Sequence, residues 1–268
     1  MLCGYFGVSR SGYYKAVTLF DKKLLNEGFI LSLVHELRRH HPRLGGKKLY
    51  FLLKEEIVKS GIKMGRDMFF ELLRKSELLV KRRRKYVSTT DSYHRFRVYN
   101  NLLKDRMLTK AHQAWVSDIT YIRTSGGFVY LFLITDIYSR KIVGWDLSDS
   151  LKIDGAIRSL QMAIRQCPDT EALIHHSDRG IQYCSHDYVN LLKKAKIKIS
   201  MTEENHCYEN ATAERVNGIL KQEYGLDDTF SSERYAAKAV KEAICFYNTE
   251  RPHWSLKLAT PQQVHTAA

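Results

Sequence analysis

The chain has 268 residues, of which 44% are hydrophobic and 27% are charged, and its formal net charge is +14. This composition is typical of a globular protein, and the length is enough for one large domain or two ordinary domains with buried cores. The longest apolar run, Phe128–Ile134, is too short to cross a membrane. Met1–Gly4 lacks the basic and then apolar pattern of a signal peptide. We therefore expect a cytoplasmic protein without membrane contact.

The cysteine and histidine patterns do not indicate a structural metal site. The cysteine count is odd, no pair has a C-x-x-C spacing, and the positions are Cys3, Cys167, Cys184, Cys207 and Cys245. Reduced, buried thiols are the simplest interpretation. His35, His40 and His41 cluster in the sequence, but only Cys3 is near them, so a zinc site is not expected.

The positive charge is concentrated in the first part of the chain. Residues 1–110 carry 25 Lys and Arg against 10 Asp and Glu, a net charge of +15, while residues 111–268 are close to neutral. This asymmetry favours a polyanion-binding region joined to a different domain, and nucleic acid is the natural partner because neutralised phosphates release counterions. The alternative is a solvated basic surface.

Residues 1–80 are predicted to be helical. Ser9 or Ser11 is placed to cap a short helix. Residues 21–41 and 47–59 each have apolar residues on one helical face, and Ser60-Gly61 ends the second of these helices. A further helix is expected over 64–73, and its inward-facing residues would be Met68, Phe69 and Leu72.

The last two of these helices resemble a helix-turn-helix, because a Gly-containing turn joins them. An ordinary three-helix bundle has the same pattern. As a helix-turn-helix, the segment would present to DNA the basic residues Lys63, Arg66, Arg74 and Lys75. Residues 81–110 are predicted to be a basic linker or arm, which begins with the DNA-binding candidates Lys81, Arg82, Arg83, Arg84 and Lys85.

Residues 111–268 change to an α/β pattern. Strands are predicted over 115–122, 128–138, 141–147, 173–176 and 197–201, and helices over 154–166, 187–195, 208–224 and 232–248. The order β-β-β-α-β-α-β-α-α predicts three antiparallel strands followed by crossovers. The expected fold class is therefore α/β, a mixed sheet with helices on its faces, preceded by the basic all-α region.

Three carboxylates stand out by their positions. Asp118 lies inside an otherwise uncharged strand, Asp178 closely follows a short apolar strand, and Glu214 lies on a helix among small residues. Sites form at strand ends beside a topological switch, and buried carboxylates need a cation partner. Mg²⁺ prefers oxygen ligands, and two such ions together support phosphoryl transfer. Any one of these acids alone is most simply a solvated or capping residue.

The spacing and local motifs resemble a known family. Asp118 and Asp178 are 60 positions apart, and 35 residues separate Asp178 from Glu214. The matching segments, in order, are Trp115–Tyr121, Asp136–Trp145, His176–Tyr183, Asn210–Glu214 with Lys221, and Tyr247–His253. They resemble the transposases of bacterial insertion sequences of the IS-three family, which share the catalytic core of retroviral integrases. The amino-terminal Gly7–Tyr14 and the helix-turn-helix are similar to the family with less specificity.

The resemblance implies a fold, an activity and a site. The fold would be ribonuclease-H-like, with a five-stranded mixed sheet over 111–268 and a helical carboxyl-terminal tail. Asp118, Asp178 and Glu214 would be catalytic and would hold two Mg²⁺, for which Mn²⁺ would substitute. Water would free a 3′-hydroxyl at the element end, and that hydroxyl would attack a second phosphodiester. No covalent enzyme–DNA intermediate is expected.

Several neighbours of the three acids are candidate DNA contacts. Lys221 lies two helical turns after Glu214 on the same face, where the family carries a basic residue. Asn210 would orient DNA or cap its helix, and Arg179 and Tyr183 would either contact DNA or hold the loop after Asp178. Two further predictions concern support of the site, namely that the His175–His176 pair is structural and that Asp136 is a hydrogen-bonding support.

The sequence departs from the family in one respect. It has no heptad run of three or more repeats, so we expect the downstream reading frame alone, with the upstream-frame product as a possible partner. Because two DNA ends must be handled together, a homo-oligomer on double-stranded DNA, associated with the bacterial nucleoid, is expected. Two other functions stay open: a non-catalytic protein that occupies element ends, and a ribonuclease-H-like nuclease acting on RNA–DNA hybrids.

Overall fold

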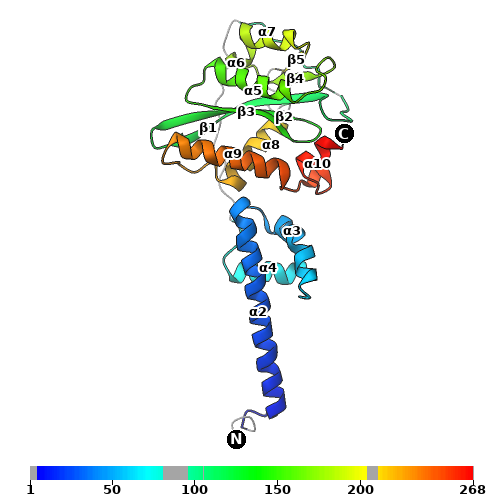
Figure 1. Cartoon of the computed structure of the whole chain (residues 1–268), viewed down its shortest axis with the longest axis vertical. Helices are drawn as coiled ribbons and strands as arrows, with labels where there is room; N and C mark the ends of the chain where they lie inside the picture. The colour runs from blue at the N-terminus through cyan, green and yellow to red at the C-terminus, as the bar shows by residue number, and fades with distance from the viewer. Residues whose placement is uncertain (1–4, 81–95, 105, 204–210, 268) are drawn as a thin grey trace. The chain divides into compact units, whose positions relative to one another are not determined.

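The computed structural model describes residues 5–80, 96–104, 106–203 and 211–267. The chain forms two compact units, Met1–Arg82 and Arg83–Ala268, which are coloured by residue number in Figure 1. The basic run 81–85, predicted to contact DNA, lies outside the described residues. The later part of the predicted arm, 81–110, belongs to the second unit, and within that unit the Leu102 amide donates to Ser200 Oγ at 2.9 Å.

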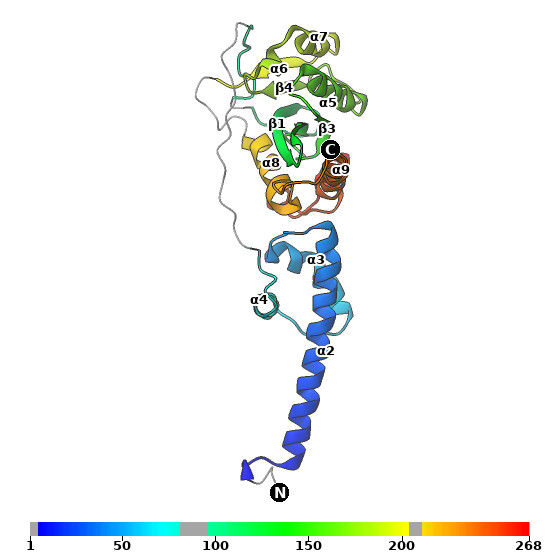
Figure 2. The same cartoon turned by 90° about the vertical axis from the view of Figure 1, so that its left-hand side faces the viewer.

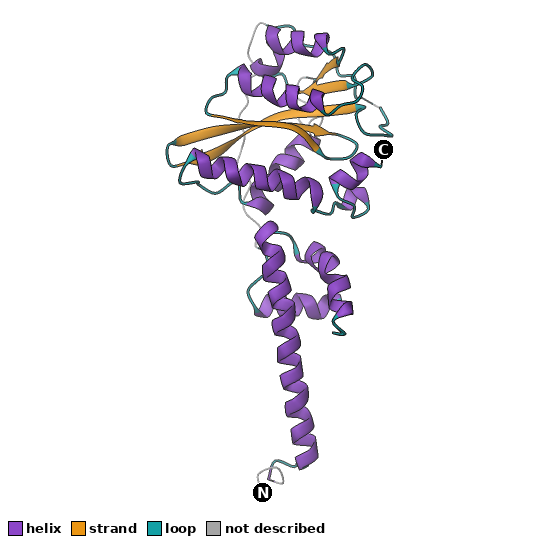
Figure 3. Ribbon diagram, in the orientation of Figure 1, coloured by secondary structure: helices purple, strands orange, loops and turns teal. Residues whose placement is uncertain are grey.

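The first unit consists of the helices α2 (Arg10–His40), α3 (Gly46–Lys59) and α4 (Arg66–Lys75), drawn in purple in Figure 3. The predicted short helix and the predicted helix 21–41 are one continuous helix, so that expectation was wrong. Ser9 caps it, because its Oγ accepts from the Gly12 amide at 3.0 Å. No proline interrupts 10–40, and a single interior glycine is tolerated in a helix.

The core of the first unit confirms most of the predicted apolar faces. Its fully buried residues include Ile30, Val34 and Leu49. Met68, however, is 56% exposed, whereas Phe69 and Leu73 are fully buried. The inward face of α4 is therefore set by positions 69, 72 and 73, which are three and four residues apart and so share one side of a helix. The predicted inward position of Met68 was wrong.

The second unit contains one five-stranded sheet. Its strands are β1 (Ala114–Thr124), β2 (Gly127–Asp136), β3 (Ile142–Ser148), β4 (Ile174–Ser177) and β5 (Lys198–Met201). The strand order is β3-β2-β1-β4-β5. The first three strands pair antiparallel, and β4 pairs parallel with both β1 and β5. The predicted mixed sheet and the predicted strand sequence are confirmed.

Helices cover both faces of this sheet, as Figures 1 and 2 show. One face is covered by α5 (Ile153–Arg165), α6 (Ile181–Cys184) and α7 (His186–Lys194). The other face carries α8 (Ala211–Tyr224) and α9 (Glu233–Thr249). Each face has its own apolar cluster, one around Trp115 and Leu160 and one around Leu131 and Val240. The sheet is thus buried on both sides, and its strand ends are held in place.

The carboxyl-terminal segment packs beside α9. That helix ends at Thr249, three residues before Pro252, and is followed by the 3-10 turn η2 (Trp254–Leu256) and by α10 (Pro261–Thr266). A capping box at Thr260 and Gln263 begins α10. Within the ranges that the structure describes, every helix is too short or too polar to cross a bilayer.

Candidate active site

The pairing of β1 with β4 brings Asp118 and Asp178 to neighbouring positions. The two strands run parallel, and their last registered pair joins Ser117 to Ser177. Each serine is followed by an aspartate, so both acids emerge at the same point of adjacent strands. At Asp178 the chain leaves the sheet in a tight turn, in which the Gly180 amide donates to Asp178 Oδ1 at 2.9 Å. The topological switch of the sheet therefore carries two carboxylates.

Helix α8 places the third acid over the same strand. Its buried residues Val216 and Leu220 belong to the core on the β1–β2 face of the sheet. Asn217 lies one turn after Glu214 and is buried, and its Nδ2 donates to Asp118 Oδ2 at 2.7 Å. Since residues three apart lie on one side of a helix, this bond turns the face that carries Glu214 toward Asp118. Glu214 itself is exposed.

The surroundings of Asp118, including the charges of the other two acids, disfavour its ionised form. The pKa of Asp118 is raised to about 7, first by burial, then by the charge of Asp178, and to a smaller extent by that of Glu214. Hydrogen bonds from the Ile119 amide and from Asn217 oppose the rise because they stabilise the ionised form. A strongly shifted carboxylate whose surroundings include two other acids is typical of a functional site.

The donor set fits a hard divalent cation. All three groups are carboxylates, which Mg²⁺ prefers over nitrogen and sulfur, and a cation would offset the burial and the repulsion that raise the pKa of Asp118. Across the described ranges, no three acid, histidine or cysteine side chains already form a coordination cluster. The backbone of Glu214 is held in place by α8, while its carboxylate is exposed. The Glu214 side chain can therefore turn toward the two aspartates.

Lys221 lies two turns after Glu214 and is half-buried. Its Nζ lies 4.5 Å from the centroid of the Tyr121 ring, on the strand that carries Asp118. Burial lowers the pKa of Lys221, and the charge of Asp118 opposes that effect. The Lys221 ammonium is thus held on the strand that carries Asp118, close enough to feel the charge of that acid. The predicted phosphate contact is compatible with this position and stays a prediction.

The other predicted DNA contacts near Asp178 have different surroundings. Tyr183 is buried in α6 and its ring packs at 5.4 Å from that of Tyr188, so it belongs to the core rather than to an exposed loop. The expected DNA contact of Tyr183 is therefore withdrawn, and the alternative that it holds the loop agrees with the structure. Arg179 donates from Nε to the Thr202 carbonyl at 2.8 Å and ties the loop to the end of β5. Asn210 lies outside the described residues.

The residues expected to support the site are buried beneath it. His175 Nε2 lies 2.6 Å from Ser117 Oγ and 2.9 Å from the Tyr188 hydroxyl, and burial lowers its pKa to about 3. It is therefore neutral and structural at physiological pH. Asp136 is fully buried and accepts from the His112 amide and from both the amide and the hydroxyl of Ser139, each at 2.8 Å. It supports a turn, as predicted from the sequence.

Asn217 contacts a predicted site residue, Asp118, and was not singled out from the sequence. We expect Asn217→Leu to lower DNA cleavage by about 10- to 100-fold, because a hydrogen bond to a charged group contributes about 1.5–3 kcal/mol. Loss of the donor also raises the pKa of Asp118, so the acid limb of the cleavage profile should move to higher pH. The measurement is a single-turnover pH–rate profile, with Asn190→Leu on the exposed face of α7 as control. An unchanged profile would remove Asn217 from the site.

Comparisons with known proteins show the family to which the chain belongs. A family model described as Integrase core domain matches residues 109–207, and a second with the same description matches 195–261. The "Insertion element IS600 uncharacterized 31 kDa protein" of Shigella sonnei is 35% identical over 264 residues, which cover 97% of this chain and 96% of that protein. "Transposase InsF for insertion sequence IS3A" of Escherichia coli (strain K12) is 30% identical over 268 residues, which cover 98% and 92%.

The solved structures that match this chain are more distant in sequence. The HTLV-2 integrase catalytic core domain in complex with magnesium (trimeric form) is 17% identical, with a TM-score of 0.46 over 58% of this chain and 97% of that chain. A simian T-cell lymphotropic virus intasome in complex with the PP2A regulatory subunit B56 gamma is 16% identical, with a TM-score of 0.49 over 86% and 73%. The family assignment depends on the relatives that align along nearly their whole length, and these show that the chain belongs to the IS3 family of insertion-sequence transposases.

Proposed function

We propose that this chain catalyses two phosphoryl transfers on double-stranded DNA, and so is a transposase that integrates and recombines DNA. In the first, water attacks a phosphodiester at the end of an insertion sequence and releases a 3′-hydroxyl. In the second, that hydroxyl attacks a phosphodiester of target DNA, and the displaced 3′-oxygen leaves as a hydroxyl. The observation that carries the proposal is the convergence of the three acids. The pairing of β1 with β4 places Asp178 beside Asp118, and the Asn217 bond turns the Glu214 face of α8 toward Asp118. Burial, and then the charges of the other two acids, raise the pKa of Asp118.

The chemistry requires a cofactor that these acids are suited to hold. We assign Asp118, Asp178 and Glu214 to two Mg²⁺, with Mn²⁺ as a substitute, because carboxylates fit hard divalent ions. When bound, the ions supply charge neutralisation and activation of the attacking oxygen. The protein itself orients the metal ligands and contacts the DNA phosphate. Asn217 orients Asp118 through its 2.7 Å bond, and Lys221 offers a cation to the phosphate beside the scissile bond.

The basic first unit is proposed to hold the element end. Its turn between α3 and α4 contains Gly61 in the left-handed conformation at φ 72°, which suits a tight connection. Arg66 and Arg74 are exposed on α4, although each lies beside an acid of the same helix, Asp67 at 2.8 Å and Glu71 at 3.9 Å. Such exposed pairs are weak and exchange readily for phosphate contacts.

We expect Arg66→Gln combined with Arg74→Gln to weaken binding of element-end DNA. Loss of two phosphate contacts should make the slope of log affinity against log salt shallower by about two. The measurement is a salt titration of DNA binding by fluorescence anisotropy. Lys59→Gln on α3 is a matched control that removes one charge at a site paired with Glu56. A double variant with the wild-type slope would place the DNA elsewhere.

The proposal also concerns assembly. Because one element has two ends that are joined to one target, we propose that a dimer or larger homo-oligomer of this chain acts on DNA. The upstream-frame product of the same element is proposed as a second partner. Sedimentation of the active protein–DNA complex tests this assembly. A particle that contains one chain and one DNA end, and that is still active, would contradict it.

Strand-resolved cleavage tests the function directly. A labelled duplex that spans an end of the element, taken from the DNA that flanks the gene, is incubated with Mg²⁺, with Mn²⁺ or with a chelator. We expect a metal-dependent nick with a 3′-hydroxyl at the boundary of the repeat. Binding without a nick under any metal, also when the upstream frame is fused on, would favour the non-catalytic protein. Preferential turnover of an RNA–DNA hybrid would favour the nuclease.

A further inference from the structure

Among the described residues, hydrogen bonds join α8 to the rest of its unit at its beginning, in its middle and at its end. At its beginning, Arg140 Nη1 donates to Thr212 Oγ1 at 2.6 Å. In its middle, Asn217 donates to Asp118. At its end, Glu223 accepts from Nε and Nη2 of the buried Arg251, both at 2.7 Å. A helix of 14 residues is roughly 21 Å long, so these contacts fix its position and its tilt.

The Arg140 contact is the one nearest to the catalytic glutamate. Thr212 lies two residues before Glu214, in the same first turn of α8. Asn217 and Glu223 are three and nine residues beyond Glu214. A small movement of the first turn would therefore shift Glu214 while leaving the other two attachments in place. Among the hydrogen bonds of the described residues, the one from Arg140 controls that turn most directly.

Arg140 is itself held firmly. Its backbone adopts a left-handed conformation with φ 65°, which residues other than glycine seldom adopt. The Arg140 amide donates to the Asp136 carbonyl at 2.9 Å, and the Arg140 carbonyl accepts from the Tyr247 hydroxyl at 3.0 Å. Tyr247 is fully buried on α9. The guanidinium thus extends to Thr212 from a backbone that is fixed on both sides.

The neighbouring residue of α9 strengthens this arrangement. Asn248 Oδ1 accepts from the Ile142 amide at 2.9 Å, and Asn248 Nδ2 donates to the Ile142 carbonyl at 3.0 Å. The segments 139–142 and 247–251 therefore bind each other. The first binds the beginning of α8 through Arg140, and the second binds the end of α8 through Arg251. Their shared structural task is the placement of the helix that carries Glu214.

We infer that Arg140 is a positioning residue for Glu214: anchored by Tyr247, it fixes the first turn of α8 through Thr212 and so sets the distance of Glu214 from Asp118 and Asp178. The inference rests on the proposed catalytic role of Glu214. In this inference Arg140 is not a DNA contact, because its guanidinium donates to the hydroxyl of Thr212.

Thr212→Val is the decisive variant, because it removes the acceptor and keeps the shape of the side chain and the charge of Arg140. It is compared with Arg140→Met and with the double variant in single-turnover cleavage at saturating element-end DNA. Each single variant should be about 10- to 100-fold slower, since small misplacements have effects of that size. The Mg²⁺ concentration for half-maximal rate should rise several-fold, while the DNA dissociation constant of Thr212→Val stays unchanged. The double variant should be no slower than the slower single variant.

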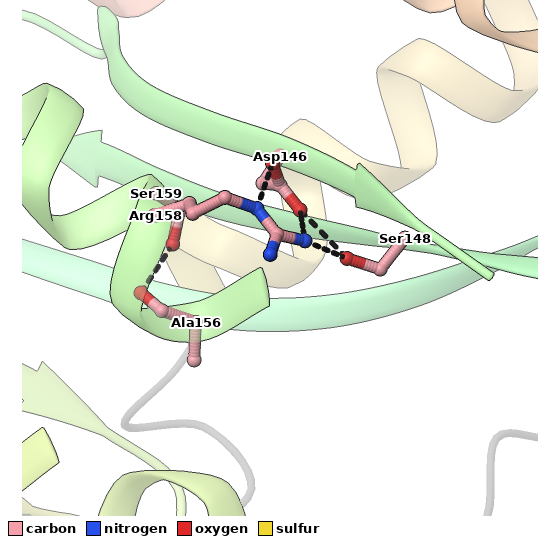
Figure 4. A network of polar contacts seen from close by, with 5 residues as sticks. All are labelled: Asp146, Ser148, Ala156, Arg158 and Ser159. Carbon is pink, nitrogen blue, oxygen red and sulfur yellow. Dashed lines mark hydrogen bonds and ion pairs between the residues drawn. The ribbon is translucent and has the colours of Figure 1, made fainter. Parts of the chain in front are cut away.

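Arg158→Met is the matched control for the loss of one arginine. Arg158 lies on α5 and binds Asp146 and Ser148 of β3, as Figure 4 shows. It should keep the wild-type cleavage rate and metal dependence. A wild-type rate and metal dependence in Thr212→Val would overturn the inference. So would an Arg140→Met variant whose only defect is weaker DNA binding, since that result would make Arg140 a phosphate contact.

A second measurement keeps the inference testable even if the proposed function fails and the wild-type protein does not cleave DNA. Hydrogen exchange of the amides at 215–218 and titration with Mn²⁺ alone are compared between the wild type and Thr212→Val. Faster exchange and weaker Mn²⁺ binding in the variant would support the positioning role independently of catalysis. Equal exchange and equal Mn²⁺ binding would refute it.

Discussion

Replacing Asp178 by Asn or Glu214 by Gln should abolish DNA cleavage while DNA binding persists. Each change keeps the size of the side chain and removes one negative ligand, and metal-assisted charge stabilisation contributes several kcal/mol to phosphoryl transfer. We expect the single-turnover rate to fall by at least about 10³-fold. Anisotropy with element-end DNA should change by less than about twofold, because the basic first unit is intact.

The control for these variants is another acid of the same unit. Asp187 is exposed in the first turn of α7 and is not one of the three carboxylates. The Asp187→Asn variant therefore removes an equal charge from a different part of the unit. It should cleave DNA at the wild-type rate. If Asp178→Asn or Glu214→Gln retained more than about a tenth of the wild-type rate, the assignment of that acid would be wrong.

Asp118→Asn should stabilise the metal-free protein at alkaline pH and abolish its response to metal. The pKa of Asp118 is raised to about 7 from 3.8, so the ionised form is disfavoured in the folded state. The resulting loss of stability is absent below pH 3.8, grows between pH 4 and 7, and is complete above pH 7. By linkage it amounts to about 4 kcal/mol at most, and Asn removes it.

Thermal melting of the second unit at pH 8 and at pH 4.5, with and without Mg²⁺, checks this prediction. Without metal, the variant should melt several degrees above the wild type at pH 8 and close to it at pH 4.5. Mg²⁺ should raise the melting temperature of the wild type only, through binding to the folded state. Asp136→Asn is the contrasting control. Asp136 is buried and accepts three hydrogen bonds, so its replacement should lower the melting temperature of the protein. A less stable Asp118→Asn at pH 8 without metal would refute the account.

The order of the five strands and of the longer helices α5, α7, α8 and α9 was predictable, because most of these elements show a strand or helix pattern in the sequence. The apolar run of β2 is typical of a strand. The short segments of β4 and β5 were also predicted as separate strands. Asp118 was identifiable as unusual because it interrupts a strand without other charges. Its link to Asp178 and Glu214 came from spacing and family motifs, since acids so far apart in the sequence cannot be paired by local pattern.

Other features depend on tertiary contacts that no local pattern encodes. The bond from Asn217 to Asp118 joins residues 99 positions apart, and that from Arg140 to Thr212 joins residues 72 apart. Tyr183 was expected in a loop because the helix that buries it has only four residues, too few to show a period. The amino-terminal half of α2 lacks a buried face, so its helix was recognised only where Ile30 and Val34 pack inward.

Counting bound metal ions tests the central claim most directly, namely that Asp118, Asp178 and Glu214 together hold the ions that act on DNA. Mn²⁺ bound per chain is measured by electron paramagnetic resonance on the complex with element-end DNA, for the wild type, Asp178→Asn and Glu214→Gln. The account predicts two ions per chain in the wild type and a loss of at least one in each variant, in parallel with the loss of cleavage. Two ions retained in both variants would contradict it, because the ions would then be held by other residues.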